Sequence, residues 1–172
     1  MKKLNLGCGK SPKKGYINLD SVKLSGVDIV HNLNKYPWPF KNNELDYVFG
    51  THILEHLENI IEPMEEIWRI TKSGARVLLE VPIFPSIGVA ADPTHKSFYT
   101  YQTFNYFRPE DSLNYYSKAR FKILERKIIF PKHFSFFTWF FNLSESMQKA
   151  YTLLFSFIFP AYALRVELET IK

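Results

Sequence analysis

The feature that most constrains the fold is an expected strand, Lys3–Leu6, that runs directly into the turn Gly7-Cys8-Gly9. Glycine in such a turn accepts positive φ angles and lets backbone amides approach a ligand closely. In a doubly wound parallel sheet, ligands bind at the carboxyl ends of the strands. A Gly-x-Gly pair also occurs in plain tight turns, so the remaining sequence has to distinguish the two interpretations.

Short strand patterns alternate with helix or loop patterns through the first two thirds of the chain. Between Ile53 and Thr71, apolar residues fall at helical spacing, with Pro63 near the expected start of the main helix and Gly74 closing it. Strands separated by helical segments predict a parallel sheet with helices on both faces. After Lys3–Leu6, further strands are expected at Tyr16–Leu19, Val27–Val30, Leu45–Phe49 and Arg76–Val81.

The last third of the chain is rich in aromatic residues, which make up 17% of the sequence. An insert from His133 to Phe159 is expected to be helical from Ser144 onward. It is too apolar to lie exposed on a soluble monomer, so we expect it to form core or a lid, a homodimer contact, or a contact with a membrane surface. Short helices are expected at Thr100–Phe107 and Asp111–Ser117, and strands at Phe121–Phe130 and Leu164–Ile171.

Length, charge and cysteine content set further limits. The 172 residues suit one domain, 1–172, and the lysines and arginines behind the net charge of +5 are spread along the chain. Nucleic acid is therefore not the expected partner, because such proteins usually cluster their basic residues. Cys8 is the only cysteine and no signal peptide is evident, which favours the cytoplasm. The apolar stretch Tyr151–Leu164 is shorter than the about 20 residues that a membrane-spanning helix needs.

Asp20 ends the second expected strand, where a carboxylate accepts hydrogen bonds from ribose hydroxyls in nucleotide-binding sheets. The third glycine of the dinucleotide fingerprint is absent, because Lys10-Ser11-Pro12 follows Gly9. That glycine permits close packing around a pyrophosphate, so its absence argues against NAD or FAD. A ligand with a ribose and an amino-acid carboxylate, but without phosphates, fits better.

Taken together, these segments resemble class I S-adenosylmethionine-dependent methyltransferases, in particular a short, type 11-like bacterial and archaeal subgroup. The resemblance implies a Rossmann-like α/β three-layer sandwich. Its sheet is mostly parallel with an antiparallel last strand, and an aromatic helical insert lies near the carboxyl terminus. The segments that carry the resemblance are Asn5–Gly9, Asp20, Pro39-Phe40 with Leu45-Asp46, His52–His56, Asp92–His95 with Phe98, and Leu164–Lys172.

The resemblance implies S-adenosyl-L-methionine as the cofactor. The glycine turn would line its methionine end, Asp20 its ribose, Asn32-Leu33 its adenine, and Thr51-His52 the neighbourhood of its sulfonium. The sequence departs from the family at Asn5, where many relatives carry an acid, and in a first helix shortened to a turn or less. Asn32 also stands where Asp is common. The cofactor residues expected are Leu6, Gly7, Cys8, Gly9, Asp20, Asn32, Leu33, Thr51 and His52.

The long loop that begins at Pro82 carries Asp92, His95 and Tyr99. Long loops at the carboxyl edge of an α/β sheet commonly carry function. His95 is the expected catalytic base toward an oxygen or nitrogen acceptor, and a histidine that braces the loop through Asp92 is the alternative. His56, Asp92 and Tyr99 are expected to contact the acceptor, which is a small molecule or is linked to a lipid or a glycan.

His52-x-x-Glu55-His56 also fits a second class of protein, because two histidines four residues apart on one helix form a zinc motif of metallopeptidases. His95, Glu65 and Glu66 would be the nearest third ligands. The run directly follows an expected strand, so we expect a turn there and no metal. A non-catalytic module that binds an S-adenosyl or nucleotide ligand is the remaining alternative.

Overall fold

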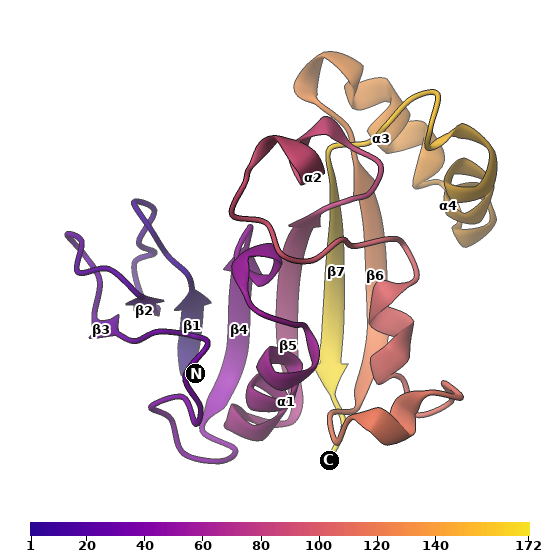
Figure 1. Cartoon of the computed structure of the whole chain (residues 1–172). Helices are drawn as coiled ribbons and strands as arrows, with labels where there is room; N and C mark the ends of the chain where they lie inside the picture. The colour runs from indigo at the N-terminus through magenta and orange to yellow at the C-terminus, as the bar shows by residue number, and fades with distance from the viewer.

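The computed structural model describes all residues from Met1 to Lys172 and contains one seven-stranded sheet (Figure 1). The strand order is β3-β2-β1-β4-β5-β7-β6. Because β4 lies beside β1 rather than beside β3, the chain crosses over in the middle of the sheet. The strands are β1 (Lys3–Leu6), β2 (Ile17–Asp20), β3 (Ile29–Val30), β4 (Leu45–Thr51), β5 (Thr71–Pro82), β6 (Phe121–Ile129) and β7 (Ala163–Thr170).

Within the first five strands, β1 to β5, all neighbouring strands are parallel. Strand β7 runs antiparallel to both of its neighbours, β5 and β6. This confirms the expected mostly parallel sheet with an antiparallel last strand. Leu6 of β1 is paired with Leu19 of β2 and with Gly50 of β4. The glycine turn, Asp20 and Thr51 therefore follow at the same edge of the sheet, where the strand order reverses.

The main helix is shorter than its apolar pattern indicates. It runs as α1 from Ile61 to Ile70, after a separate 3-10 turn, η1, at Leu54–His56. Gly74 does not close it, because Thr71 already has the extended backbone of β5. Gly74 has a φ of 76° inside β5, next to an irregularity in the pairing with β4.

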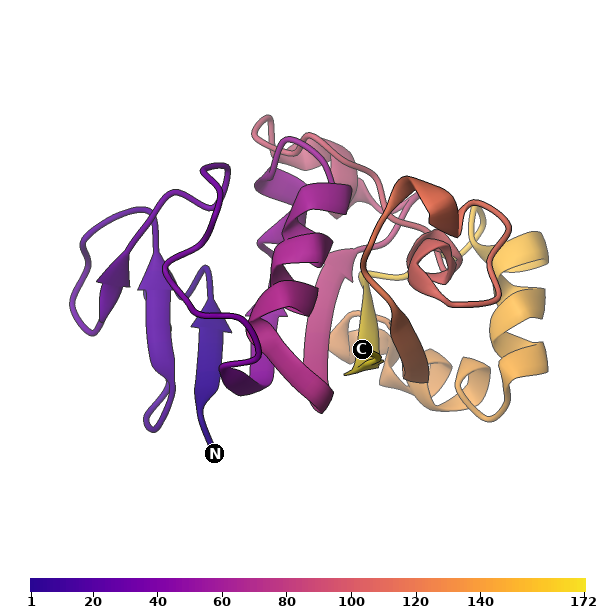
Figure 2. The same ribbon diagram turned by 90° about the horizontal axis from the view of Figure 1, so that it is seen from below.

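The connections β1–β2, β2–β3 and β3–β4 contain no helix, whereas the sequence led us to expect a shortened helix only in the first of them. Figure 2 shows the strands at this end of the sheet without a covering helix. Tyr16 packs edge-on against the rings of Tyr47 and Phe49 of β4, and Lys13 lies over Phe49 at 4.2 Å. A short aromatic and cationic cover thus stands in for the first helix.

On the same face of the sheet, β5 and β7 carry a row of charged side chains. Arg76 pairs with Glu167 at 3.3 Å, and Arg165 pairs with Glu80 at 2.7 Å. Parallel sheets are normally buried on both faces. Charged side chains on these central strands make it possible for this face to remain partly open to water.

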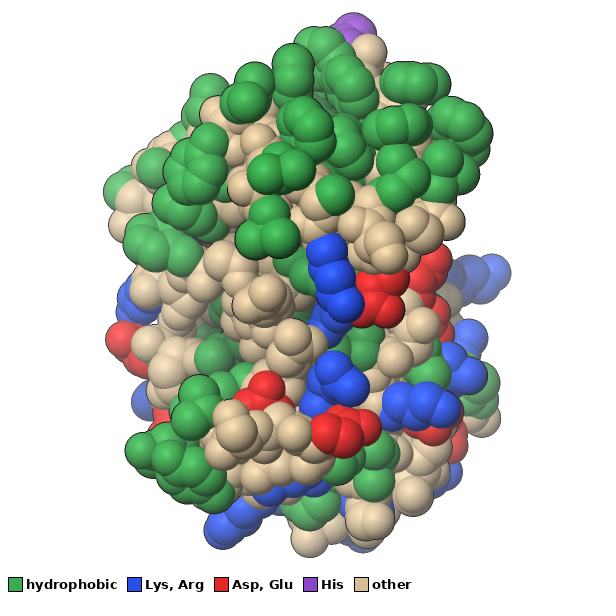
Figure 3. Space-filling view, turned by 90° about the vertical axis from the view of Figure 1, so that its right-hand side faces the viewer, with side chains coloured by type: hydrophobic (Ala, Val, Ile, Leu, Met, Phe, Trp, Pro, Cys, Tyr) green, Lys and Arg blue, Asp and Glu red, His purple; other side chains and the backbone are tan.

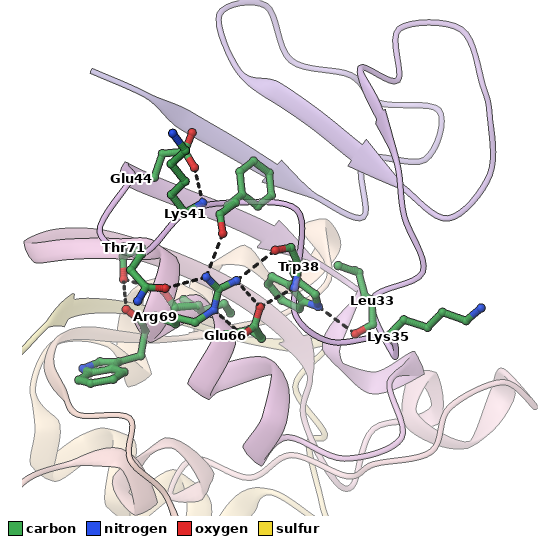
Figure 4. Close-up of polar contacts among 12 residues, drawn as sticks. Leu33, Lys35, Trp38, Lys41, Glu44, Glu66, Arg69 and Thr71 are labelled. Carbon is green, nitrogen blue, oxygen red and sulfur yellow. Dashed lines mark hydrogen bonds and ion pairs between the residues drawn. The ribbon is translucent and has the colours of Figure 1, made fainter.

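A polar network fixes the β3–β4 loop to α1 (Figure 4). The Glu66 carboxylate accepts a hydrogen bond from the Trp38 amide and pairs with the Arg69 guanidinium, which donates to the carbonyl oxygens of Trp38 and Phe40. The indole of Trp38 in turn donates to the carbonyl oxygen of Leu33 at 3.0 Å. Leu33 is therefore held in place by contacts that begin on α1.

The region before β7 is more helical than expected, since a helix already forms ahead of Ser144. The side chain of Ser144 accepts a hydrogen bond from the Met147 amide and caps the second helix of the insert. Helical elements of this region are η4 (Lys132–Phe134), α3 (Ser135–Phe141), α4 (Glu145–Ala150) and the π-helical η5 (Tyr151–Phe155). The remaining short helices are α2 (Ile87–Ala91) and the 3-10 turns η2 (Thr103–Phe107) and η3 (Asn114–Tyr116).

Only part of this insert is buried. Phe141 and Tyr151 pack against Phe130, whereas Trp139 is 60% exposed and Leu153 78% exposed. Figure 3 shows hydrophobic side chains gathered over the end of the molecule that carries these helices. None of the helices has the length and apolar character that a crossing of the bilayer requires.

Candidate active site

The glycine turn at the end of β1 is held by β2. Gly7 and Gly9 have φ angles of 63° and 49°, which glycine adopts without strain. The Asp20 carboxylate accepts hydrogen bonds from the amides of Gly9 (2.8 Å) and Val22 (3.0 Å), and the Cys8 amide donates to the Leu19 carbonyl oxygen. The expected proximity of Asp20 to the glycine turn is thus present, and each carboxylate oxygen keeps a lone pair for a ligand hydroxyl.

Asn5, the departure from the family pattern, is buried beneath this turn. Its amide nitrogen donates to the Ser11 carbonyl oxygen and to the side-chain oxygen of Asn18, 2.9 Å away. The orientation of Asn18 is fixed, because its oxygen also accepts from the Lys13 amide while its nitrogen donates to Asp28 and to backbone carbonyl oxygens. Position 5 therefore requires a hydrogen-bond donor, which a carboxylate is not.

At the end of β4 the backbone turns sharply at His52, whose φ is 52°. Its imidazole lies 3.2 Å from Glu55 and 3.5 Å from Glu80. Hydrogen bonding to Glu55 and then to Glu80 raises the pKa of His52 to about 9. His52 is therefore an imidazolium at neutral pH, held between two carboxylates.

A cavity of about 510 Å³ opens beside His52. It brings together four of the residues expected from the sequence, although they come from two separate segments of the chain. No residue of the glycine turn is among its lining residues, so the cavity is distinct from the expected cofactor groove. The lining consists of His52, Glu55, His56, Pro82, Gly88, Ala91, Asp92, Pro93, His95 and Tyr162.

His56 and His95 pack against one another in the cavity, and hydrogen bonds show which nitrogen of each ring donates. Nδ1 of His95 lies 3.0 Å from the Val89 carbonyl oxygen and so donates to it. Thr94 donates its hydroxyl hydrogen to Asp92, so its oxygen accepts from Nδ1 of His56 at 2.8 Å. Both Nδ1 atoms thus act as donors, and Nε2 is the nitrogen of each ring that can accept from a ligand.

Glu55 is the residue of this site that the sequence did not single out for the acceptor or cofactor. It is fully buried, and one carboxylate oxygen, Oε2, has no hydrogen-bond partner. Nε2 of His95 lies 4.0 Å from the other oxygen, Oε1. The signal for Glu55 was its position between two histidines, but its partner His95 lies on a distant loop.

Tyr99 does not lie in this cavity. Its ring is 1% exposed and stacks on Phe104 in the core, and burial followed by the nearby Glu55 raises the pKa of its hydroxyl. The expectation that Tyr99 contacts the acceptor is wrong, because the chain between His95 and Tyr99 turns back into the core. Asn32 is exposed and its side chain accepts from the Asn34 amide, while Leu33 is buried.

The zinc-peptidase arrangement does not form. Its motif needs both histidines of the run on one face of an α-helix, but His52 precedes η1 and its ring is bound by Glu55 and Glu80. The suggested ligands Glu65 and Glu66 lie elsewhere, because Glu65 accepts from Ser117 and Glu66 pairs with Arg69. The run forms the turn after a strand, as the favoured interpretation required.

Comparison with known proteins agrees with this description. Residues 13–79, which include β2 to β4 and most of β5, match the family described as "Methyltransferase domain". No curated protein sequence matches the chain.

Three solved structures illustrate the similarity of fold. A SAM-dependent methyltransferase from Archaeoglobus fulgidus has a TM-score of 0.65 at 19% identity, covering 98% of this chain and 85% of its own. An S-adenosylmethionine-dependent methyltransferase from Mesorhizobium loti has a TM-score of 0.59 at 13% identity, covering 98% and 90%. Phosphoethanolamine N-methyltransferase 2 of Haemonchus contortus, in complex with S-adenosyl-L-methionine, has a TM-score of 0.59 at 12% identity, covering 99% and 49%.

The chain has the fold of S-adenosylmethionine-dependent methyltransferases, and its residues 13–79 match a methyltransferase domain. Both findings agree with the resemblance drawn from the sequence.

Proposed function

We propose that the chain binds S-adenosylmethionine at the carboxyl ends of β1, β2 and β4 and transfers its methyl group to an acceptor in the adjacent cavity. The observation that carries this proposal is the Asp20 carboxylate turned toward the glycine turn at that edge. S-adenosylmethionine supplies a methyl group already activated on a sulfonium. The main task of the chain is therefore to align the acceptor with that methyl group.

The residues of the groove fit this cofactor. A Cβ added to Gly9 would meet no atom within 4 Å, so the space beside this glycine is open to a ligand. Asp20 binds the ribose hydroxyls with its remaining lone pairs, and Asn32 and Leu33 receive the adenine. The side chains of Leu6 and Cys8 are buried, so these residues would meet the cofactor through their backbone, next to Thr51 at the end of β4.

The charges at the cavity side of the groove are balanced. His52 and Arg165 carry positive charge and Glu55 and Glu80 carry negative charge, with Arg165 bound to Glu80 at 2.7 Å. Asp92 adds one further carboxylate to the cavity wall. In this proposal His52 acts mainly by positioning the two carboxylates.

His95 is the proposed base. Its Nδ1 donates to the Val89 carbonyl oxygen, so Nε2 is the atom that accepts a proton from an acceptor hydroxyl or amine in the cavity. His56 and Asp92, which also line the cavity, contact the acceptor. With cofactor and acceptor bound, Nε2 of His95 would hold the proton that the acceptor loses on methylation.

Among small-molecule, glycan and lipid-linked acceptors, the surface around the cavity supports a lipid-linked one. Tyr162 lines the cavity and is 48% exposed, and Phe157, which is 78% exposed, contacts Phe84 just after Pro82 of the cavity wall. Apolar residues this exposed usually mark an interaction surface. No acidic residue occurs in 131–143 or 150–164, so this rim is compatible with an anionic membrane surface. A homodimer contact through the same surface is the alternative.

The test uses methyl-labelled S-adenosylmethionine with separate lipid and water-soluble extracts of the source cells. We expect label in a lipid product and a rate about 10²–10⁴ lower for His95→Ala, with cofactor affinity within about twofold. His133→Ala, which removes an exposed histidine outside the cavity, is the control. Cofactor binding without transfer to any fraction would favour the non-catalytic binding module.

A further inference from the structure

We infer that Glu55, His56 and His95 form a binding site for one divalent transition-metal ion of the zinc type. One potential ligand atom of each residue lies within 4.8 Å of those of the other two. The site combines one histidine of the 52–56 run with a histidine of the long loop, and so differs from the peptidase motif. It rests on the proposed function and deepens it, because the three residues line the proposed acceptor cavity. With an ion bound, Nε2 of His95 would hold the ion in place of a proton, and the ion would polarise the acceptor group in the role otherwise given to His95.

The hydrogen bonds of the two histidines leave Nε2 of each ring available to a metal ion. Nδ1 of His95 donates to the Val89 carbonyl oxygen and Nδ1 of His56 donates to Thr94, whose hydroxyl is in turn bound to Asp92. Histidines that bind metals commonly donate their other ring N–H to a carbonyl, carboxylate or similar acceptor, which orients the ring. Nε2 of each ring makes no hydrogen bond within the chain.

Glu55 supplies an independent observation. It is fully buried, yet its Oε2 has no partner, and a buried carboxylate oxygen without a partner is costly. The other oxygen accepts from His52 and lies 4.0 Å from Nε2 of His95. A cation bound to the Glu55 carboxylate would offset the cost of burying this charge.

The surrounding charges favour a cation. The carboxylates of Glu55, Glu80 and Asp92 surround the site, and the basic groups beside them are His52 and Arg165, which is bound to Glu80. Two imidazole nitrogens and one carboxylate oxygen match zinc and its neighbours better than calcium or magnesium, which prefer oxygen ligands. An oxygen of the acceptor or a water molecule can complete the coordination from the cavity.

The test titrates the metal-free full chain with Zn²⁺ by calorimetry and with Co²⁺ by visible absorption. We expect one ion per chain and cobalt bands without a thiolate component, because Cys8 is buried elsewhere. Glu55→Gln and His95→Ala should each weaken binding at least tenfold, and Thr94→Val about tenfold through the orientation of His56. His133→Ala should change the affinity less than twofold.

His56→Asn, at a partly exposed position, serves as a further variant if the buried Glu55→Gln fails to fold, which circular dichroism and thermal unfolding would reveal. No saturable binding to the wild-type chain, or binding that persists in the His56 and His95 variants, would overturn the inference. Titration of the metal-free chain with S-adenosylmethionine separates the two proposals. Cofactor binding without metal binding contradicts the metal site alone, and metal binding without cofactor binding contradicts the proposed function alone.

Discussion

The side-chain amide of Asn5 donates to the side-chain oxygen of Asn18, 2.9 Å away, beneath the glycine turn. Both residues are buried, and Asn18 cannot reverse its amide without losing bonds to Lys13 and Asp28. The residue that departs from the family pattern thus has a structural role that depends on its being a donor. This relationship explains why the turn keeps its form without a first helix.

Asn5→Asp is expected to lower the free energy of unfolding by about 1–3 kcal/mol, because a buried carboxylate would face two acceptor oxygens that have lost their donor. Urea unfolding followed by circular dichroism measures the change. The control is Asn32→Asp, an equivalent substitution at an exposed position, which should cost less than about 0.5 kcal/mol. An Asn5→Asp variant as stable as the wild type would show that Asn18 can adapt.

The two glycines of the turn are expected to differ in what they tolerate. An added Cβ at Gly7 would lie 2.5 Å from the side chain of Ile53, whereas one at Gly9 would meet nothing within 4 Å. Gly7→Ala should therefore impair folding, and Ile53→Ala in the same chain should partly restore it. Gly9→Ala should cost only about 1–2 kcal/mol for its positive φ.

Gly9→Ala should instead weaken S-adenosylmethionine binding, since its methyl group enters the open space of the groove. Calorimetric titration of the folded variant measures this effect. Unchanged cofactor affinity in Gly9→Ala would mean that the cofactor does not approach this part of the turn.

The network between α1 and the β3–β4 loop should matter more than the charges on the open sheet face. Arg69→Met removes donors to Glu66 and to the carbonyl oxygens of Trp38 and Phe40, and should cost about 1.5–3 kcal/mol in urea unfolding. Arg76→Met, which removes an exposed ion pair with Glu167, should cost less than about 1 kcal/mol. Equal costs would contradict the distinction between the two sites.

Binding to anionic vesicles is expected to involve Trp139. Trp38 is buried and Trp68 donates to the Ile171 carbonyl oxygen, so a blue shift of tryptophan fluorescence on vesicles should come from Trp139. Trp139→Phe should lose the shift while the chain still sediments with the vesicles. A concentration-dependent dimer in sedimentation velocity, with no vesicle binding, would support the homodimer instead.

Much of the sheet could be predicted because several strands end at a local signal, as β1 does at Gly7 and β5 at Pro82. The strand boundaries at Lys3–Leu6 and the pairing of Asp20 with the glycine turn follow from local sequence. The end of α1 could not be predicted from local sequence, because Gly74 resembles a helix cap. Only the pairing of β5 with β4 places Gly74 within a strand. The early helix α3 was missed because its run of aromatic residues lacks a helical polar face.

The candidate site was predictable residue by residue but not as a cluster. His56 and His95 are separated in the sequence by α1, β5 and α2. Their contact depends on the loop after β5 folding back over η1, where the Lys96 amide donates to the Glu55 carbonyl oxygen. Tyr99 was assigned to the acceptor because it lies near His95 in sequence. Its ring packs in the core instead, and no local pattern distinguishes these two outcomes.

The most direct test of the central claim is calorimetric titration of the wild-type chain and Asp20→Ala with S-adenosylmethionine, S-adenosylhomocysteine and NAD. Asp46→Asn, at the opposite end of β4, is the control. We predict binding of both S-adenosyl ligands and not of NAD, with at least a tenfold loss in Asp20→Ala and none in the control. Tight binding of NAD alone, or S-adenosylmethionine binding unaffected by the loss of Asp20, would contradict the account.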